Sequence, residues 1–451
     1  MSGRDDLLDV AERLVRDARA AGADAADAVA GESDGLEVGV RMGDVEKLKR
    51  ARERRAGLRV FVGNSTAIVS TADLSAAGLA ELASDACALA RATAPDRFAG
   101  LPEPGDLATE QPDLDLYDSA AESLGVETAL ALAREAEDAA LAASPEIDNS
   151  EGAECSGGGG RVAYASSLGF AGAYAASSFG LVVSPVARRN GAMQRDYWYT
   201  SARHVARLDP PAAVGAEAAR RTLRRLGARR VPTTECPVVF DPETAASLLR
   251  HIAAAISGTA LYRRASFLLD RLGERIAAPG VTVIDDPLRP GGAASRPFDG
   301  EGVASRRRTI VRDGVLESWL LDSYSARRLG LRPTGHASRA AGDAPGVAPT
   351  NFHMVAGPFA PEAIVASVPS GLYVTELIGF GVNMVTGDYS RGAAGLWIEG
   401  GELAYPVEEL TIAGNLRDIL AGITMVGSDL VLRSATSAPT VKVERMTVAG
   451  T

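Results

Sequence analysis

The spacing of apolar residues in the first third of the chain alternates between helical and strand periods. Apolar residues that recur every three or four positions indicate an amphipathic helix, and strict alternation with polar residues indicates a half-buried strand. In chain order, this spacing predicts a helix over 7–18 stopped by Gly22, a strand over 36–42, a hairpin of strands 58–62 and 67–70 around Gly63-Asn64, a helix from about Ser75, and an alanine-rich helix over 126–143.

The middle of the chain is predicted to be mainly strands, from Val162 onward and again over 195–199 in the same sheet. A helix over 211–226 follows, and we interpret its four arginines as a solvated face rather than a ligand site. These arginines are Arg220, Arg221, Arg224 and Arg225. The segment 228–236, with two arginines and Pro232, is the predicted boundary between two domains, 1–230 and 231–451.

Beyond the boundary, a short strand over 237–240 leads into Asp241-Pro242, a good N-cap and first position for a helix that runs to about Gly258. Two hairpins follow, 309–319 around Asp313-Gly314 and 396–405 around Gly400-Gly401, since these turn residues tolerate positive φ. The sequence therefore predicts an α+β protein. Its N-terminal domain combines helices with a β-sheet, and its second domain is largely antiparallel β with a few helices.

Composition limits the classes of partner and location. The formal net charge of the 451 residues is -11, so we expect no binding to nucleic acid or to an anionic membrane. Residues 162–187 lack charge, but they are rich in Gly, Ser and Ala and suit strands better than a membrane helix. Three widely spaced cysteines and a charged N-terminus without signal-peptide features favour a reducing cytoplasm.

His251 is the histidine most worth testing as a metal ligand, because it lies on the helix that begins at Asp241. It sits about 110° from the centre of the apolar stripe of that helix. One turn before it is Ser247 and one turn after it is Ala255, neither of which is a usual zinc ligand. The sequence therefore predicts a helix-surface histidine without a metal, and no catalytic residue in this helix.

The remaining candidates for chemistry are weaker. His336, His353 and Cys236 could assemble from separate loops, but no carboxylate stands beside either histidine in sequence as a base or orienting partner. His204 is isolated. The run Gly157–Gly160 lacks the Gly-Lys-Ser/Thr ending of a phosphate loop and is interpreted as a flexible turn.

The most site-like segment is 375–392, where small residues would let another backbone approach closely. Extended peptides bind well to open strand edges, so we predict peptide binding here. An irregular β-bulge and turn with satisfied polar groups explains the same residues equally well. The polar side chains predicted to contact a peptide are Glu376, Asn383, Asp388, Tyr389 and Arg391.

Blocks along nearly the whole chain resemble the TldD/PmbA family of bacterial peptidases, and within it the PmbA (TldE) type of subunit. The resembling blocks are 70–75, 112–116, 195–197, 262–264, 266–270, 323–327, 386–395 and 412–416. In the active subunits of this family, the helix after the strand carries H-E-x-x-x-H, whereas the matching window 250–255 here reads Arg-His-Ile-Ala-Ala-Ala. The family's third ligand is a cysteine near the C-terminus, and 432–443 contains none.

This resemblance implies a subunit of a heteromeric cytoplasmic metalloprotease that acts on unfolded peptides in an internal cavity. A TldD-like partner would carry the zinc, with a glutamate as general base, and this chain would need no cofactor. Some members bear an older name as modulators of DNA gyrase. Two alternatives stay open: an independently active metallopeptidase with non-standard ligands, and a peptide-binding homodimer without a protease partner.

Overall fold

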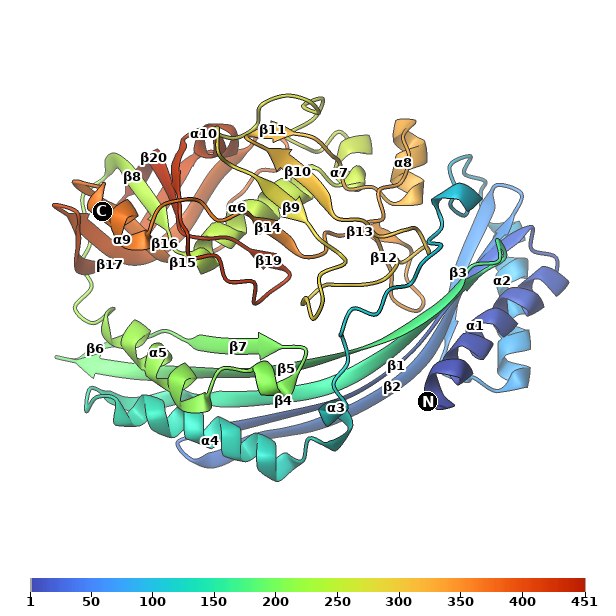
Figure 1. Cartoon of the computed structure of the whole chain (residues 1–451), viewed down its shortest axis with the longest axis horizontal. Coiled ribbons are helices and arrows are strands. Elements are labelled where there is room, and N and C mark those ends of the chain that lie inside the picture. The colour runs from blue at the N-terminus through green and yellow to red at the C-terminus, as the bar shows by residue number, and fades with distance from the viewer. Residues whose placement is uncertain (1, 451) are drawn as a thin grey trace.

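The computed structural model describes residues 2–450, which form two large β-sheets stacked across the molecule (Figure 1). In the first sheet the order is β3-β2-β1-β4-β5-β6, with β7 also paired to β5, and every neighbour is antiparallel. Its strands are β1 (Ala25–Arg41), β2 (Asp44–Val62), β3 (Ser65–Thr71), β4 (Ile147–Ser166), β5 (Ala171–Arg189), β6 (Ala192–Arg195) and β7 (Trp198–Ala202).

The second sheet belongs to the C-terminal half and has the order β17-β16-β15-β8-β20-β18. Strand β17 also pairs with β20, so this sheet closes on itself, and only β15 and β8 are parallel neighbours. Its strands are β8 (Thr234–Phe240), β15 (Ser370–Ile378), β16 (Asp388–Glu399), β17 (Glu402–Asn415), β18 (Ile423–Val426) and β20 (Val441–Ala449).

Shorter strands and the helices complete the fold. A five-stranded sheet contains β9 (Val283–Asp285), β10 (Arg308–Arg312), β11 (Val315–Leu316), β14 (Phe352–Met354) and β19 (Thr436–Ser437), and β12 (Ala337–Ser338) pairs with β13 (Gly346–Val347). The helices are α1 (Ser2–Ala20), α2 (Ala76–Ala92), α3 (Ala120–Ser123), α4 (Val126–Ala142), α5 (Pro211–Leu223), α6 (Pro242–Ala255), α7 (Gly258–Tyr262), α8 (Ser323–Leu329), α9 (Pro361–Ala366) and α10 (Leu416–Ala421).

The predicted α+β class is confirmed, and so are the elements with strong local signals. The Ser75 side chain accepts a hydrogen bond from Gly78 N at the start of α2, and Asp241 caps α6 in the same way at Thr244 N. Asp313 and Gly314 have positive φ in the turn between β10 and β11. The uncharged segment 162–187 forms parts of β4 and β5, as predicted. Among residues 2–450, no helix combines the length and apolar character that crossing a membrane requires.

The interpretation of Gly157–Gly160 as a flexible turn is wrong. These glycines lie in the middle of β4, where Gly158 pairs with Gly35 of β1 and Ser178 of β5. A Cβ on Gly159 would lie 2.9 Å from the Tyr117 ring, so the absence of a side chain lets this segment pack against the strand. The run is a requirement of sheet packing and not a loop.

The two faces of the first sheet have different neighbours. Ala26, Ala28 and Ala30 pack with α1 and α2, and further along β1 Leu36 and Val38 pack with α4 and α5, so helices cover this face at both ends. The opposite face turns toward the C-terminal half (Figure 1). On it, Val29 and Tyr164 pack against Phe298.

A buried ionic network joins the first sheet to the C-terminal half. Asp27 accepts hydrogen bonds from Arg59, from Arg339 at 2.6 Å and from the Tyr164 hydroxyl at 3.1 Å. Arg59 also contacts Glu301 at 3.0 Å. The side chains of Asp27 and Arg339 are fully buried, so each charge depends on the others for compensation.

Candidate functional site

Helix α6 is the natural starting point for a site, because it carries His251 and strands from distant parts of the C-terminal half converge on it. Its apolar face is fully buried, with Leu248, Leu249 and Ile252 at 0% exposure. The helix packs against β8, β14, β15 and β19. It is therefore fixed in position, and any side chain it presents to a cavity is held rigidly.

His251 on α6 is half-buried, which corrects the prediction of a surface histidine. Its ring meets Tyr389 of β16 edge to face, with 6.0 Å between centroids and 80° between planes. Its Nε2 atom is buried and has no hydrogen-bond partner within residues 2–450. Burial and then the charges of Arg391 and Arg250 lower the pKa of His251 to about 4, so the ring is neutral at pH 7.

The donor set around His251 does not fit a zinc ion. Ser247 uses its hydroxyl to bind the Thr244 carbonyl, and Ala255 has no donor atom. Zinc requires three or four converging ligands drawn from Cys, His, Asp and Glu. Throughout residues 2–450, no group of three such side chains is arranged to hold a metal ion.

Two of the five predicted peptide-binding residues, Tyr389 and Arg391, lie beside His251. Tyr389 is 1% exposed and its hydroxyl has no hydrogen-bond partner in the described chain. Arg391 is half-buried, and its Nη2 donates to the Leu377 carbonyl at 3.3 Å, while its Nε is buried without a partner. Burial raises the pKa of Tyr389 to about 12, and both the charge of Arg391 and the approach of its guanidinium to the phenol oppose this rise, so the phenol is neutral.

The other predicted residues are engaged in other contacts, although Asn383 and Asp388 line an open pocket together with Tyr389. Asn383 accepts hydrogen bonds from Val385 N and Thr386 N, and Asp388 accepts one from the Thr386 hydroxyl at 2.6 Å. Both side chains therefore stabilise the turn between β15 and β16. Glu376 is engaged elsewhere, in an ion pair with Arg225 of the N-terminal half.

The four arginines of 220–225 lie on α5 or just after it. Contrary to the prediction, most of them are shielded from solvent. Arg220 is exposed, but Arg221 is buried and Arg224 and Arg225 are half-buried. Arg221 lies 3.5 Å from Asp241. Arg224 has no ion-pair partner within the described chain, and its Nε and Nη2 atoms are buried without hydrogen bonds. Charge-run patterns alone could not reveal this, because the opposing acidic residues come from distant segments.

His336 differs from the prediction in having a carboxylate partner. Its Nε2 lies 3.1 Å from Asp285 Oδ2, and its Nδ1 lies 2.8 Å from the Thr334 hydroxyl. The same hydroxyl accepts a hydrogen bond from Leu321 N, so it is committed to the backbone. His336 is 2% exposed, which makes this a buried structural network.

The other histidines and cysteines form no cluster. His204 lies 3.0 Å from Asp115 Oδ1, and His353 contacts the Asn351 carbonyl. The three cysteines are buried and free. Burial raises the pKa of Cys155 and of Cys236 to about 11, which keeps both thiols protonated and unreactive.

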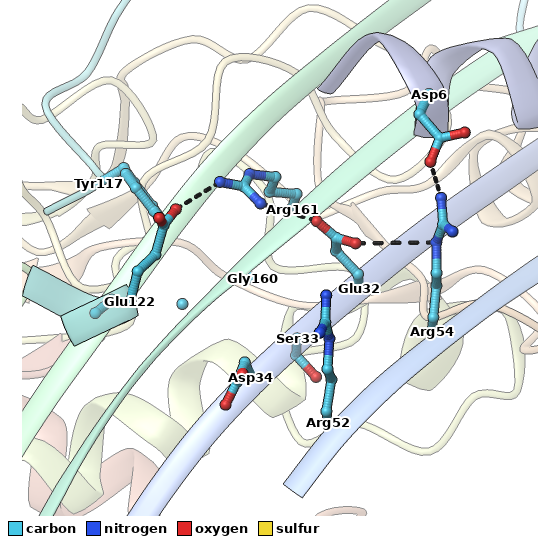
Figure 2. Close-up of a pocket in the computed structure, with 12 residues that line it drawn as sticks. Asp6, Glu32, Ser33, Asp34, Arg52, Arg54, Tyr117, Glu122, Gly160 and Arg161 are labelled. Carbon is cyan, nitrogen blue, oxygen red and sulfur yellow. Dashed lines mark hydrogen bonds and ion pairs between the residues drawn. The ribbon is translucent and has the colours of Figure 1, made fainter. Parts of the chain in front are cut away.

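A pocket of about 580 Å³ lies on the helix-covered face of the first sheet, between α1 and α3 (Figure 2). Figure 2 shows Arg161 between Glu122 and Glu32, with distances of 2.7 and 2.9 Å. Arg54 pairs with Asp6 and also approaches Glu32. Opposite charges are thus matched side by side, as in a salt-bridge network, and no nucleophile or metal-ligand group stands out.

An open trough of about 550 Å³ occupies the opposite face of the same sheet. Side chains alternate between the two faces along a strand, so the odd-numbered residues of β1 that line the trough point to the same face as Val29. This is the face that turns toward the C-terminal half. Small side chains leave the strand backbones accessible there. The small residues lining the trough are Ser33, Gly35, Ala51, 156–160 and 176–178, and charged side chains also line it at Asp34, Glu37, Lys49, Glu53 and Arg203.

Family models for three successive domains match the chain. They describe PmbA/TldA metallopeptidase domain 1 at residues 26–90, the central domain at 120–226 and the C-terminal domain at 233–450. Metalloprotease PmbA of Escherichia coli O157:H7 is 40% identical over 427 residues, or 95% of this chain and 92% of that protein. A PmbA homologue of Haemophilus influenzae is 37% identical over 92% of this chain and 90% of its own length.

Solved structures agree with these sequence matches. A candidate modulator of DNA gyrase from Bacteroides thetaiotaomicron has a TM-score of 0.90 and 28% identity, covering 98% of both chains. TldE from Thermococcus kodakarensis shares the fold, with a TM-score of 0.88 and 20% identity over 97% of this chain and 99% of its own. The chain belongs to the PmbA/TldD metallopeptidase family.

Proposed function

We propose that this chain is a PmbA/TldE-type subunit of a cytoplasmic metalloprotease complex and is not catalytic by itself. A TldD-like partner would supply the zinc and the general base. The complex would degrade or process unfolded peptides, and this subunit would help to form the chamber that receives them.

The observation that carries the proposal is the donor set of α6. A metallopeptidase needs an ion held by several ligands with an open position for water. In the window 250–255 only His251 is of a ligand type, and Arg391 and Arg250 place positive charge beside it. A divalent cation would be repelled, so cleavage needs a second subunit.

The peptide-binding part of the proposal is supported by the open trough on the first sheet. Small residues at Gly35, Gly158 and Gly160 leave room for an extended chain. The backbone groups of β1 and β4 are already paired within the sheet, so an extended peptide would lie against this face through its side chains and van der Waals contacts. Tyr389 and Arg391 are the members of the predicted set whose polar atoms stay free for a peptide, whereas Asn383 and Asp388 serve a turn.

The test measures bound zinc and cleavage of an unstructured protein such as casein. The chain alone should hold far less than one zinc per molecule and cleave nothing. The chain with the TldD-like protein of the same organism should cleave casein, and a chelator should abolish that activity. The TldD-like protein alone is the control for activity that does not need this chain.

Each other outcome favours a different function. One equivalent of zinc and chelator-sensitive cleavage by the chain alone would establish an independent metallopeptidase and overturn the proposal. A dimer of the chain that binds peptides, does not associate with the TldD-like protein and changes none of its activity would favour a peptide-binding homodimer.

A further inference from the structure

The group formed by His251, Tyr389 and Arg391 contains three buried polar atoms without hydrogen bonds. They are Nε2 of the histidine, the hydroxyl oxygen of the tyrosine and Nε of the arginine. Buried polar atoms without partners are rare, and each costs stability. Three on adjacent side chains of α6 and β16 point to a missing partner.

The charges in this group favour an anion as that partner. The imidazole and the phenol are neutral at pH 7, because their pKa values lie at about 4 and about 12. Arg391 is therefore the charged member, and among the described side chains it forms no ion pair and donates a hydrogen bond to the Leu377 carbonyl. Since Arg391 and His251 are half-buried, part of each side chain remains open to solvent.

The donors suit a carboxylate in particular. A guanidinium donates two parallel hydrogen bonds to the two oxygens of a carboxylate, and a phenol can donate a third. The existing bond from Arg391 Nη2 to the Leu377 carbonyl fixes the guanidinium without neutralising it. A neutral imidazole next to these donors can add a further N–H.

The surroundings of Tyr389 suit a peptide that carries the carboxylate. Tyr389 also lines an open pocket with Phe380, Val382 and Met384. Asn383 and Asp388 line the same pocket, and the Asp388 carboxylate accepts hydrogen bonds from Thr386 and Asn415. Phe380 is 99% exposed, an unusual position for a large apolar side chain. Apolar side chains adjacent to a buried cationic donor would contact residues next to the carboxylate of a bound peptide.

We infer that Arg391, Tyr389 and His251 form a binding subsite for a carboxylate of the peptide substrate, at the place on α6 where the family's active subunits carry their metal ligands. This inference rests on the proposed function, because it names a feature of the peptides that the chain would hold. The carboxylate is either the C-terminal group or an aspartate or glutamate side chain.

Binding of short peptides to the full-length chain alone tests the inference by calorimetry. Three N-acetylated hexapeptides of alanine, serine and leucine are compared: one with a free C-terminal carboxylate, one amidated, and one amidated with an internal glutamate. We expect a peptide with a carboxylate to bind about tenfold more tightly than the neutral one. Preference for the free C-terminus or for the glutamate identifies the source of the carboxylate.

Two conservative variants locate the effect. Arg391→Gln and Tyr389→Phe should each reduce the preference for the carboxylate to about threefold or less, with little effect on binding of the neutral peptide. Arg250→Gln, which removes an exposed arginine one residue before His251, is the matched control and should keep the preference. Thermal unfolding curves establish that each variant is folded before binding is compared.

Equal affinity for all three peptides would overturn the inference, and so would a preference that survives both variants. Neither result depends on the TldD-like partner. If the mixed complex cleaves casein while the chain shows no carboxylate preference, the proposed function stands and the subsite does not. If the carboxylate preference is found but no partner-dependent cleavage occurs, the subsite stands and the proposed function does not.

Discussion

Arg225 and Glu376 form an ion pair across the two halves of the chain, with 2.6 Å between Nη2 and Oε2. Arg225 lies two residues beyond the end of α5, and Glu376 is in β15, which belongs to the second sheet. The arginine side chain is 14% exposed and the glutamate side chain is 37% exposed, so water screens the pair only in part. The contact fixes the C-terminal end of α5 beside the strand that leads to the predicted peptide-binding loop.

Glu376→Gln should lower the free energy of unfolding by about 1 kcal/mol, because it removes a partly shielded ion pair while keeping the size of the side chain. Urea unfolding measures this. Glu409→Gln is the matched control, since the Arg230–Glu409 pair has both side chains more than half exposed. It should change the unfolding free energy by less than about 0.5 kcal/mol. Equal effects of the two variants would mean that the position of Arg225 between the two halves of the chain does not increase the contribution of its ion pair to stability.

Asp27→Asn should destabilise the chain much more, by about 3 kcal/mol or more. The substitution leaves the buried cations Arg59 and Arg339 with only Glu301 for compensation. Chemical unfolding of the variant and of Asp34→Asn provides the comparison. Asp34 pairs with Arg50 at an exposed position, so its loss should cost little. A small effect at Asp27 would contradict the view that this network holds the first sheet to the C-terminal half.

Local signals were sufficient to predict much of the fold. Asp241 with Pro242 started α6, and Asp313-Gly314 formed its hairpin, because caps and turns depend on neighbouring residues alone. The first eleven residues of β1, 25–35, were not predicted. They include Gly31, Asp34 and several alanines, which have low strand propensity, and their extended form depends on pairing with β2 and β4 on both sides.

Most of the candidate site could not be predicted because its contacts join distant segments. The buried Arg221 forms an ion pair with Asp241, 20 residues further along the chain. His336 forms a hydrogen bond with Asp285, which lies 51 residues away in sequence. Tyr389 and Arg391 were selected for their polar groups in a glycine-rich segment. The sequence does not indicate that these two residues pack beside His251. It also does not indicate that the side chains of Asn383 and Asp388 form hydrogen bonds within a turn instead.

The titration of His251 should make the stability of the chain depend on pH. Its pKa is about 4 when folded, below the usual value of 6.5, so between these values the unfolded chain binds more protons. Stability should therefore rise as pH increases from 4 to 6.5 and be fully present above 6.5. Urea unfolding at several pH values should show a weaker dependence in His251→Gln than in the natural chain.

Nuclear magnetic resonance can measure the same pKa directly, because the chain contains only four histidines. The resonance that disappears in His251→Gln identifies the ring. It should stay neutral down to about pH 5 in the folded protein, because burial and the charge of Arg391 oppose protonation. A midpoint near 6.5 would contradict the half-buried position of His251 against Tyr389.

Gly57→Ala tests the close approach of the C-terminal half to the first sheet. A Cβ at this position of β2 would lie 2.9 Å from the Ala341 carbonyl carbon and closer still to Gly342 N. Both are backbone atoms, so they can move only if the segment that carries Arg339 moves with them. Because Arg339 compensates Asp27, we expect Gly57→Ala to lower the free energy of unfolding by about 1–3 kcal/mol and to expose 339–343 to protease.

Gly35→Ala is the matched control, because it also adds a methyl group to a central strand of the same sheet. Nothing lies within 4 Å of its Cβ, on the open trough. This variant should have a melting temperature equal to or slightly above that of the natural chain. Alanine has less backbone conformational entropy than glycine in the unfolded chain, so less entropy is lost on folding. Equal stability of the two variants would show that 339–343 does not pack against β2. The position of Arg339 beside Asp27 would then have to be fixed by other contacts.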